Sequence, residues 1–564
     1  MGDAVNDRRR RPRLGTVTEI GEALEVADAV TASWQAHCDV LVVGWGAAGA
    51  SCALEARAQG ADVCVLDRFS GGGASALSGG VVYAGGGTSY QQQAGHTDRP
   101  EWMAAYLSHE VGDVVQPRTL QRFCEESAAN LAWLEQHGVR FGATTPRHKT
   151  SYPPAGVFLY YSGNEVVPRY AVPGVEGPPA PRGHRAISDG QSGAALFAAL
   201  ACATRQAGVR CLTQTAVRRL VVEAGSRRVV GVQAWQLPAH HEATRRHAEL
   251  DRLIPKWRLY QPGRAEAARR EQADIEREHA RPLLIRARRA VVLSTGGYIY
   301  NRELLERHAL QFKQGWPIGG AGCDGSGLRL GQSVGGAAQD LDNISAWRFI
   351  TPPYAWPKGL VVNARGERFC NEQVYGATLG HEMMAHQGGR AWLILDGALR
   401  WQTLRDCLFG RLWAFQSLPA LLMMFKVAVK APTLADLARR IGADAATLQA
   451  QVEQASAAAR GECEDAFGKS TDMRHVFGKG PFFAIDISIT QKFFPLATLS
   501  LGGLRVDEDS GQVLDAQGVG IAGLYAAGRS AIGLASRRYV SGLSLADCIF
   551  SGRRAGRASA ATHT

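Results

Sequence analysis

Residues 38–68, CDVLVVGWGAAGASCALEARAQGADVCVLDR, carry the strongest fold signal in the chain. An apolar run leads into a glycine turn, a segment with helical periodicity follows, and a second apolar run ends at Asp67. This order predicts strand, turn, helix and strand within about 30 residues, a Rossmann-like βαβ unit of an α/β protein. Gly44, Gly46 and Gly49 form GxGxxG between the first strand and the helix, and Asp67 follows Gly49 by 18 residues.

The chemistry of a dinucleotide explains this spacing. Gly44 makes the tight turn, Gly46 lets the backbone approach a pyrophosphate, and Gly49 lets the helix pack on the strand. The N-terminus of the helix, at Ala47 and Ala48, faces the phosphates with its free N–H groups, and Asp67 accepts hydrogen bonds from ribose hydroxyls. The sequence therefore predicts a dinucleotide site here.

Small residues beyond the second strand favour FAD over NAD. The run GGGASALSGGVVYAGGGT, residues 71–88, suits a backbone lying against a flat ring system, and Ser75 is placed to reach the pyrophosphate. It holds no histidine, so we expect FAD to be bound without a covalent link. The runs STGGYIYN (294–301) and GLYAAGRS (523–530) complete the predicted site. The candidate cofactor residues are Gly44, Gly46, Ala47, Ala48, Gly49, Asp67, Arg68, Ser75, Ser78, Gly79, Gly80, Thr295, Gly296, Gly528, Leu543 and Ser544.

The composition narrows the remaining function classes. With 564 residues, 46% hydrophobic and 20% charged, the chain predicts an ordinary globular protein of at least two domains. Its net charge of +11 comes partly from the run Arg8–Arg13, but no basic face interleaved with aromatic residues indicates nucleic-acid binding. Eleven cysteines without metal-ligand spacing, and no apolar run of membrane-spanning length, predict a cytoplasmic protein without a metal site or an integral membrane segment.

Changes in composition along the sequence predict how the domains are arranged. Residues 1–37 are expected to form an N-terminal tail, and residues 38–300 the first part of the FAD-binding domain. A charged helical insertion at the surface, about residues 238–283, interrupts that part. Residues 301–479, richer in Trp, Met and Phe, are expected to form an inserted α+β substrate or capping domain, and residues 480–564 complete the first domain.

Taken together, the motifs resemble one family of flavoproteins. GCDGSGLRLGQSVGG (322–336), VNARGERFCNE (362–372) and GLYAAG (523–528) join the glycine-rich runs in a likeness that covers residues 38–556. The chain resembles the flavoproteins grouped with fumarate reductase and the 3-ketosteroid dehydrogenases. This resemblance implies a FAD domain with an inserted capping domain, and an active site between the two.

Two positions favour the steroid branch of that family. Fumarate-type members grip a dicarboxylate with arginine, whereas this chain has Tyr539 before its last helix and Tyr375 after its "NE" motif. Phenols do not replace a bidentate arginine clamp, so we expect a neutral substrate, and a ketone suits them. The order Tyr539-Val540-Ser541 is similar to 3-ketosteroid Δ4-dehydrogenases that act on 5α-saturated substrates, and GVFLYYSGNE (156–165) adds to that likeness.

The resemblance implies removal of two hydrogens across carbons 4 and 5 of a 3-ketosteroid, a step of steroid degradation. Tyr539 would take the proton from carbon 4 with Ser541 as relay, and Tyr375 would support the relay or the carbonyl. Tyr160 and Gly542 are expected to contact the substrate, and the electron acceptor stays unknown. A 3-ketosteroid Δ1-dehydrogenase, a fumarate-type reductase and a flavin-binding protein without turnover remain as alternatives.

Overall fold

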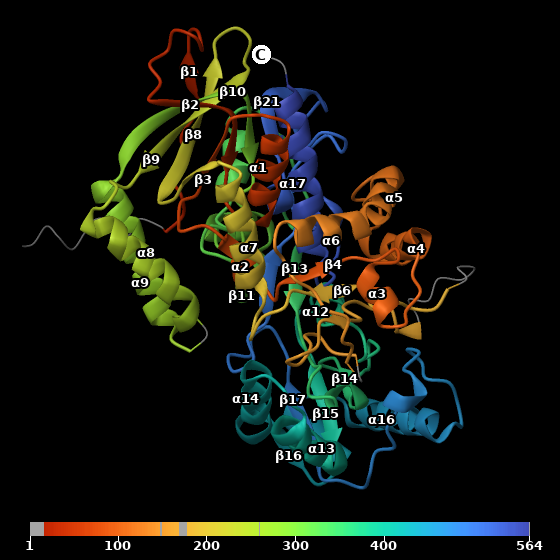
Figure 1. The fold of residues 1–564 in the computed structure, drawn as a ribbon. Coiled ribbons are helices and arrows are strands. Elements are labelled where there is room, and N and C mark those ends of the chain that lie inside the picture. The colour runs from red at the N-terminus through yellow and green to blue at the C-terminus, as the bar shows by residue number, and fades with distance from the viewer. Residues whose placement is uncertain (1–15, 147–148, 169–176, 259, 563–564) are drawn as a thin grey trace, which may run out of the picture.

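The structure is a computed structural model of the chain, and it describes residues 16–146, 149–168, 177–258 and 260–562. The basic run Arg8–Arg13 lies outside these residues. Figure 1 shows a large sheet with its helices in the upper half of the molecule, and a smaller helical and sheet region in the lower half. The two regions have the predicted α/β architecture, a Rossmann-like domain with an inserted α+β domain.

The upper sheet has nine strands, and its centre is the predicted βαβ unit. β2 (Ala36–Val43) pairs in parallel with β3 (Val63–Leu66), and α1 (Ala47–Ala58) connects them. The strand order is β1-β8-β9-β10-β2-β3-β7, with β21 and β20 attached at β10. The remaining strands of this sheet are β1 (Leu24–Val26), β7 (Arg210–Leu212), β8 (Thr215–Glu223), β9 (Val229–Gln236), β10 (Arg281–Leu293), β20 (Gln512–Leu514) and β21 (Gly520–Ala526).

Residues from the two ends of the chain close this domain around α1. α17 (Leu543–Ala561) runs beside α1, as Figure 1 shows, and the contact is made by small residues. A Cβ atom at Gly552 would meet the Ala48 carbonyl oxygen at 2.4 Å, and one at Gly556 would meet that of Cys52 at 2.4 Å. Any larger side chain at either position would push the helices apart.

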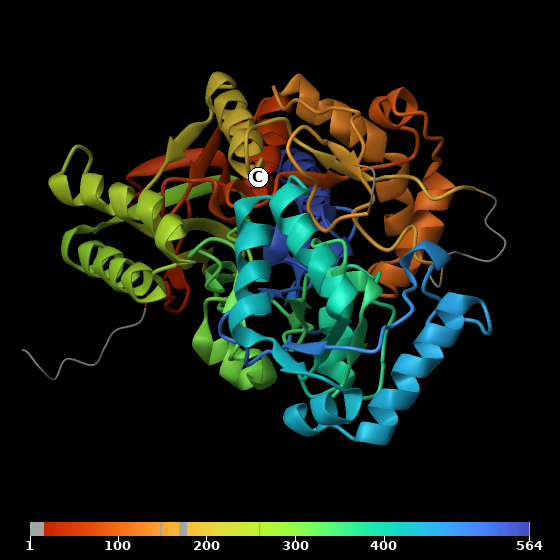
Figure 2. The same cartoon turned by 90° about the horizontal axis from the view of Figure 1, so that it is seen from below.

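The lower domain is built on a four-stranded antiparallel sheet. Its order is β14 (Leu360–Val362), β15 (Trp392–Asp396), β17 (Phe482–Asp486) and β16 (Val429–Ala431). The helices α13 (Gly397–Phe409), α14 (Ala414–Leu422), α15 (Leu434–Ile441) and α16 (Ala445–Arg460) surround it, whereas α12 (Gly376–His386) packs on β13 (Ile344–Trp347) of a separate three-stranded sheet. Figure 2, seen from below, brings the teal helices of this domain to the front.

The expected domain limits differ from the structure in three places. Residues 24–26 of the expected tail form β1, which pairs with β8 at the edge of the large sheet. β17, expected in the FAD-binding part, pairs with β15 and β16 of the lower sheet. α11 (Ser326–Gln332), expected in the capping domain, packs on β8 of the upper domain. Short apolar strands pair with partners that are distant in sequence, so local pattern does not assign them to a domain.

The charged insertion is a helical hairpin, as predicted. It consists of α8 (Glu242–Trp257) and α9 (Pro262–His279), and it leaves the sheet between β9 and β10 (Figure 1). It is more than a surface excursion, because its inner face lines a cavity described below. None of the described helices combines the length and the apolar character needed to cross a bilayer. All eleven cysteines are free thiols.

Candidate active site

The first cavity, here called the glycine-turn cavity, has a volume of about 780 Å³ and lies at the N-terminus of α1. The GxGxxG turn, the end of β3 and the residues around Ser75 form one wall, and the α8–α9 hairpin forms the opposite wall. Of the predicted cofactor residues, nine line it: Gly44, Gly46, Ala47, Ala48, Asp67, Arg68, Ser75, Thr295 and Gly296. The fold therefore brings segments that are far apart in the sequence together around one cavity.

The glycine turn fits a dinucleotide. Gly44 has φ +104°, and a Cβ atom there would lie 2.5 Å from the Ser294 carbonyl oxygen, so this position needs glycine for the fold itself. At Gly46 a Cβ atom would come no nearer than 3.3 Å to a protein atom, the Ser75 hydroxyl oxygen, so the protein leaves space beside this backbone. No acidic residue occupies the first turn of α1, which leaves its positive end free for an anion.

Asp67 and Arg68 end β3 in different surroundings. The Asp67 carboxylate accepts hydrogen bonds from the Trp45 and Phe69 N–H groups at 2.8 Å each, and its burial raises its pKa. These bonds fix the carboxylate and leave lone pairs for further donors. Arg68 forms ion pairs with Glu276 of α9 at 2.9 Å and with Asp324 at 3.0 Å, so its charge is used within the protein.

The other predicted cofactor residues lie outside this cavity. Ser78, Gly79 and Ser544 line a second cavity instead. The remaining four line neither cavity, and two of them are packing positions: a Cβ atom on Gly49 would lie 1.9 Å from the Gly44 oxygen, and one on Gly528 would lie 2.9 Å from the Ala48 Cβ atom. The two others are Gly80 and Leu543.

The second cavity, here called the aromatic cavity, has a volume of about 520 Å³, within the range of small-molecule sites. It shares wall residues with the glycine-turn cavity, so the two spaces meet. Aromatic and aliphatic side chains form most of its surface, and a flat apolar ligand suits such walls. They include Tyr152, Trp316, Trp347, Phe349, Trp356, Phe415, Phe494, Leu499 and Leu545.

Three predicted catalytic residues, Tyr375, Tyr539 and Ser541, line this cavity together and are here called the hydroxyl cluster. The rings of Tyr375 and Tyr539 lie 6.4 Å apart, nearly parallel, and Trp347 packs on Tyr539 at 4.3 Å between ring centroids. Gly542, a predicted substrate contact, also lines the cavity; it begins α17 with φ +88°. The resemblance therefore predicted residues that the fold brings together at this cavity.

The hydrogen bonds of Ser541 run differently from the expected relay. Its hydroxyl lies 3.1 Å from the Tyr160 hydroxyl, and its hydrogen bond to Tyr375 favours ionisation of that phenol. Among the described residues no hydrogen bond links Ser541 to Tyr539. Tyr160 is fully buried behind Ser541 and is not part of the cavity wall, so it does not occupy the predicted substrate position. Ser541 therefore connects Tyr375 and Tyr160.

The segment GVFLYYSGNE places the hydroxyl cluster from behind. Ser162 donates a hydrogen bond to the Ser541 carbonyl oxygen at 3.0 Å. Asn164 accepts one from the Tyr375 N–H at 2.7 Å and donates another to Thr378 at 2.9 Å. One short stretch thus holds both Tyr375, at the start of α12, and Ser541, before α17. The segment therefore fixes the backbone positions of Tyr375 and Ser541 relative to each other.

Arg529 is a functional candidate that the sequence analysis missed. It lies in the short 3-10 helix η7 (Gly528–Ser530), one residue beyond the predicted Gly528, and lines both cavities where they meet. Its Nη2 donates to the Cys323 sulfur at 3.3 Å, whereas its Nη1 is buried and has no partner among the described residues. A buried, unsatisfied cationic donor facing a cavity fits a bound group that accepts hydrogen bonds. The sequence signal for Arg529 was its position within GLYAAGRS (523–530), a run that was predicted to complete the cofactor site.

Burial and nearby charge give Tyr539 and Tyr375 different pKa values. Burial raises the pKa of Tyr539 to about 12, and the Arg529 guanidinium acts against that rise. Burial raises the pKa of Tyr375 further, well above its ordinary value, with a contribution from Tyr539. Tyr539 is therefore the phenol that gives up its proton more readily, and Tyr375 the one that stays a hydrogen-bond donor.

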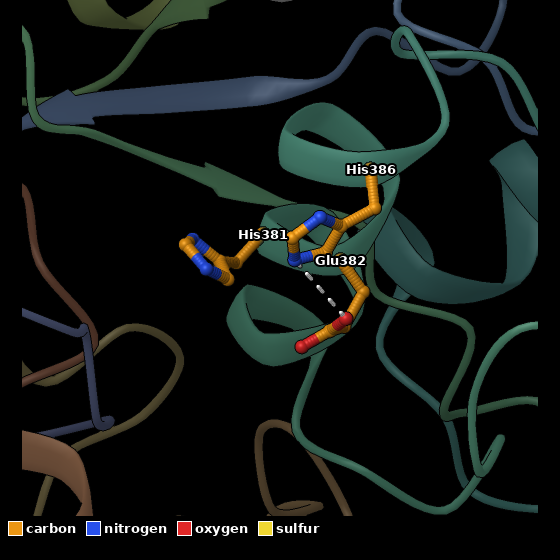
Figure 3. A group of neighbouring side chains, drawn as sticks. All are labelled: His381, Glu382 and His386. Atoms are coloured by element: carbon orange, nitrogen blue, oxygen red, sulfur yellow. Dashed lines mark ion pairs between the residues drawn. The ribbon is translucent and has the colours of Figure 1, made fainter.

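One further group of polar side chains lies away from both cavities. His381, Glu382 and His386 of α12 could supply three metal ligands, and Figure 3 shows them leaving this helix side by side. His386 and Glu382 form an ion pair at 3.9 Å, and both histidines are exposed. The sequence analysis expected no metal and did not single out these residues.

The comparisons with known proteins agree with this geometry. Residues 39–544 match the family model described as FAD binding domain, so the chain belongs to this family of FAD-binding flavoproteins. It is 54% identical over 527 residues to the 3-oxo-5-alpha-steroid 4-dehydrogenase of Comamonas testosteroni, over 92% of this chain and 97% of that protein. FAD as the cofactor and the resemblance stated from the sequence are both confirmed.

Two other relatives show whether the chain is more similar to 4-dehydrogenases or to 1-dehydrogenases. The 3-ketosteroid-delta4-(5alpha)-dehydrogenase of Rhodococcus jostii RHA1, solved with 4-androstene-3,17-dione, is 30% identical with a TM-score of 0.79, over 96% of this chain and 99% of that chain. The 3-oxosteroid 1-dehydrogenase of Mycolicibacterium smegmatis is 26% identical, over 87% of this chain and 91% of that protein. The likeness is thus stronger to the 4-dehydrogenases than to this 1-dehydrogenase.

Proposed function

We propose that this protein is a FAD-dependent 3-oxo-5α-steroid 4-dehydrogenase, which forms a double bond between carbons 4 and 5 of a saturated 3-ketosteroid. The observation that carries the proposal is that the hydroxyl cluster lines the aromatic cavity, and that this cavity meets the glycine-turn cavity. The 54% identity to a 3-oxo-5-alpha-steroid 4-dehydrogenase supports the same regiochemistry. Family membership and the empty space beside Gly46 support FAD as the oxidant.

The residues divide the work according to their surroundings. Tyr375 donates a hydrogen bond to the 3-keto oxygen, and the chain of hydroxyls through Ser541 and Tyr160 stabilises the charge that develops there. Tyr539 takes the proton from carbon 4, and the nearby Arg529 keeps more of this phenol ionised than burial alone would allow. FAD, when bound, supplies the acceptor for the two electrons that leave with the hydrogen of carbon 5.

The glycine-turn cavity would hold FAD through the residues described above. The positive end of α1 would face the pyrophosphate, Asp67 the ribose, and Arg529 the polar edge of the flavin. None of the described residues that line this cavity is a histidine, in keeping with the expected non-covalent attachment. Acid precipitation of the holoenzyme should therefore release yellow flavin into the supernatant.

The steroid substrate, an unidentified electron acceptor and a cytoplasmic location complete the proposal. Eleven free thiols are what a reducing compartment favours. The experiment is anaerobic mixing of the FAD-loaded protein with 5α-saturated, 5β-saturated and 4-ene 3-ketosteroids, followed by flavin absorbance. We expect the 5α-saturated compound to bleach the flavin. Bleaching by a 4-ene substrate alone would point to a Δ1-dehydrogenase, and no bleaching by any of them would contradict a steroid dehydrogenase.

A further inference from the structure

The end of the lower domain carries an unusual concentration of exposed apolar side chains. They lie on α13, on α14 and on η5 (Met423–Val427), the π-helical turn that continues α14. Trp401 is 70% exposed, Phe409 77% and Phe425 61%. Leu408, Leu418 and Leu422 are exposed beside them, and these six residues are here called the apolar tip. Clusters of this kind on a folded protein mark interaction surfaces.

The spacing of three of these residues places them on one outward face, where the Arg400 guanidinium lies over the Phe425 ring at 5.4 Å. Leu418, Leu422 and Phe425 follow one another at i, i+4 and i+7, a single stripe on the helical surface. The buried side of the same helices is formed by other residues, such as Leu399 of α13 and Ala420 of α14. Each helix therefore has one apolar face for the core and a second one that faces outward.

The charged residues of the segments that carry the apolar tip are mostly basic. Residues 397–430 contain five basic residues and one acidic residue, Asp406. Four of the basic side chains, Arg405, Arg411, Lys426 and Lys430, are exposed. Exposed Trp, Phe and Leu bordered by Lys and Arg are the composition of helices that lie in the interface of an anionic membrane. A second copy of the chain would instead bring like charges together.

The same helix that carries part of the apolar tip forms a wall of the aromatic cavity. Phe415, Gln416, Pro419 and Ala420 of α14 line this cavity, and Phe415 is 38% exposed. Figure 1 places α13 and α14 at the lower end of the molecule, away from the large sheet, and Figure 2 is the view onto that end. A flat surface touching this end would lie next to the cavity wall.

We propose that the apolar tip docks onto the surface of an anionic lipid bilayer, with α13, α14 and η5 lying in the interfacial region. The exposure and the charge carry this docking by themselves. Its purpose, uptake of a steroid from the membrane into the aromatic cavity, rests on the proposed function. Steroids dissolve in lipid far better than in water, so a site beside the bilayer shortens the aqueous path of the substrate.

The test is co-sedimentation of the FAD-loaded full chain with vesicles of phosphatidylcholine alone and of phosphatidylcholine mixed with phosphatidylglycerol. We expect binding to the mixed vesicles, weakened by salt. The double variant Leu418→Glu with Phe425→Glu should bind at least about tenfold more weakly, because two apolar side chains no longer enter the interface. Neither residue lines the aromatic cavity, so bound flavin and turnover of dispersed substrate should persist.

Val519→Glu is the matched control, because Val519 is 62% exposed on the other domain and its variant should bind like the wild type. Wild-type protein that stays in the supernatant with every vesicle would overturn the proposal, and so would unchanged binding of the double variant. A dimer that the double variant dissociates, without vesicle binding, would identify the tip as an interface between copies instead. Because binding is measured without turnover, failure of the proposed function would appear separately.

Discussion

At the scale of single residues, the account rests on the difference between two buried phenols. Tyr539→Phe keeps the ring between Trp347 and Tyr375 and removes only the hydroxyl oxygen that would accept the proton. We expect turnover of a 5α-saturated ketosteroid to fall by ~10²–10⁴, the usual contribution of a general base. Steady-state kinetics with an artificial acceptor, together with the flavin spectrum, measure this. Near wild-type turnover would assign Tyr539 to packing.

Ser541→Ala tests the hydroxyl chain in the same assay. It removes the hydrogen bond between Tyr375 and Ser541 and leaves Tyr160 without its 3.1 Å partner. Because the base itself stays in place, turnover should fall by less than in Tyr539→Phe. A larger loss than in Tyr539→Phe would mean that Ser541 serves the base directly.

The pKa of Tyr539 predicts how the rate depends on pH. With this pKa at about 12, the fraction of phenolate rises about tenfold for each pH unit below that value. The rate of flavin bleaching at low substrate concentration should therefore climb steadily from pH 6 to pH 9, and stopped-flow absorbance measures it. A plateau above pH 7 would indicate a base of lower pKa, such as histidine.

Gly44 and Gly46 separate folding from cofactor binding. Gly46→Val places its side chain in the free space beside the turn, so the protein should fold and contain little or no FAD. Gly44→Val would clash with the Ser294 carbonyl at a positive φ, so the whole domain should be destabilised. Circular dichroism and the ratio of flavin to protein distinguish the two. A flavin-loaded Gly46→Val protein would contradict the placement of the pyrophosphate.

Sequence alone predicted the residues that belong to fixed motifs and missed those that depend on their neighbours. The glycine turn, Asp67 and the hydroxyl cluster follow from spacing and resemblance. The position of Tyr160 behind Ser541 depends on pairing between β5 (Leu159–Tyr160) and β6 (Gly183–Arg185), which no local pattern shows. Arg529 became a candidate only when its unpaired Nη1 was seen between two cavities.

At the scale of elements, the α8–α9 hairpin changes meaning between sequence and structure. Its charges and composition predicted a helical insertion at the surface. Their inner face, which forms part of the glycine-turn cavity, is fixed by contacts with the segment after β3, where Arg68 pairs with Glu276 and the Ser70 N–H donates to Asp251. Arg68 is the central contact, since it pairs with Glu276 of the hairpin and with Asp324. Burial opposes ionisation of Glu276, yet Arg68 and His247 bring its pKa to about 2.

Arg68→Met should therefore loosen the wall of the cofactor cavity. It leaves two buried carboxylates without their cation, and breaking such a pair costs ~3–5 kcal/mol. We expect FAD to dissociate faster and at lower temperature, as followed by the increase in flavin fluorescence. Arg270→Met, whose side chain is 54% exposed on α9, is the control and should retain FAD like the wild type. Equal release from both variants would contradict a holding role for this network.

At the scale of the whole molecule, the site exists because the two domains meet. The upper domain supplies the glycine turn, Arg529 and Tyr539, and α14 of the lower domain supplies one wall of the aromatic cavity. The sequence predicted both domains but not their limits, because β1 and β17 pair with strands far away in the chain. The product of the reaction therefore tests whether the chemistry takes place at this junction of the two domains.

The position of the new double bond therefore decides whether this protein is a 4-dehydrogenase. The FAD-loaded protein is incubated with a 5α-saturated 3-ketosteroid and an artificial electron acceptor, and the product is analysed by nuclear magnetic resonance. The account predicts a 4-ene as the first product, formed with loss of hydrogen from carbons 4 and 5. A 1-ene from the same substrate, with carbon 5 still saturated, would contradict it.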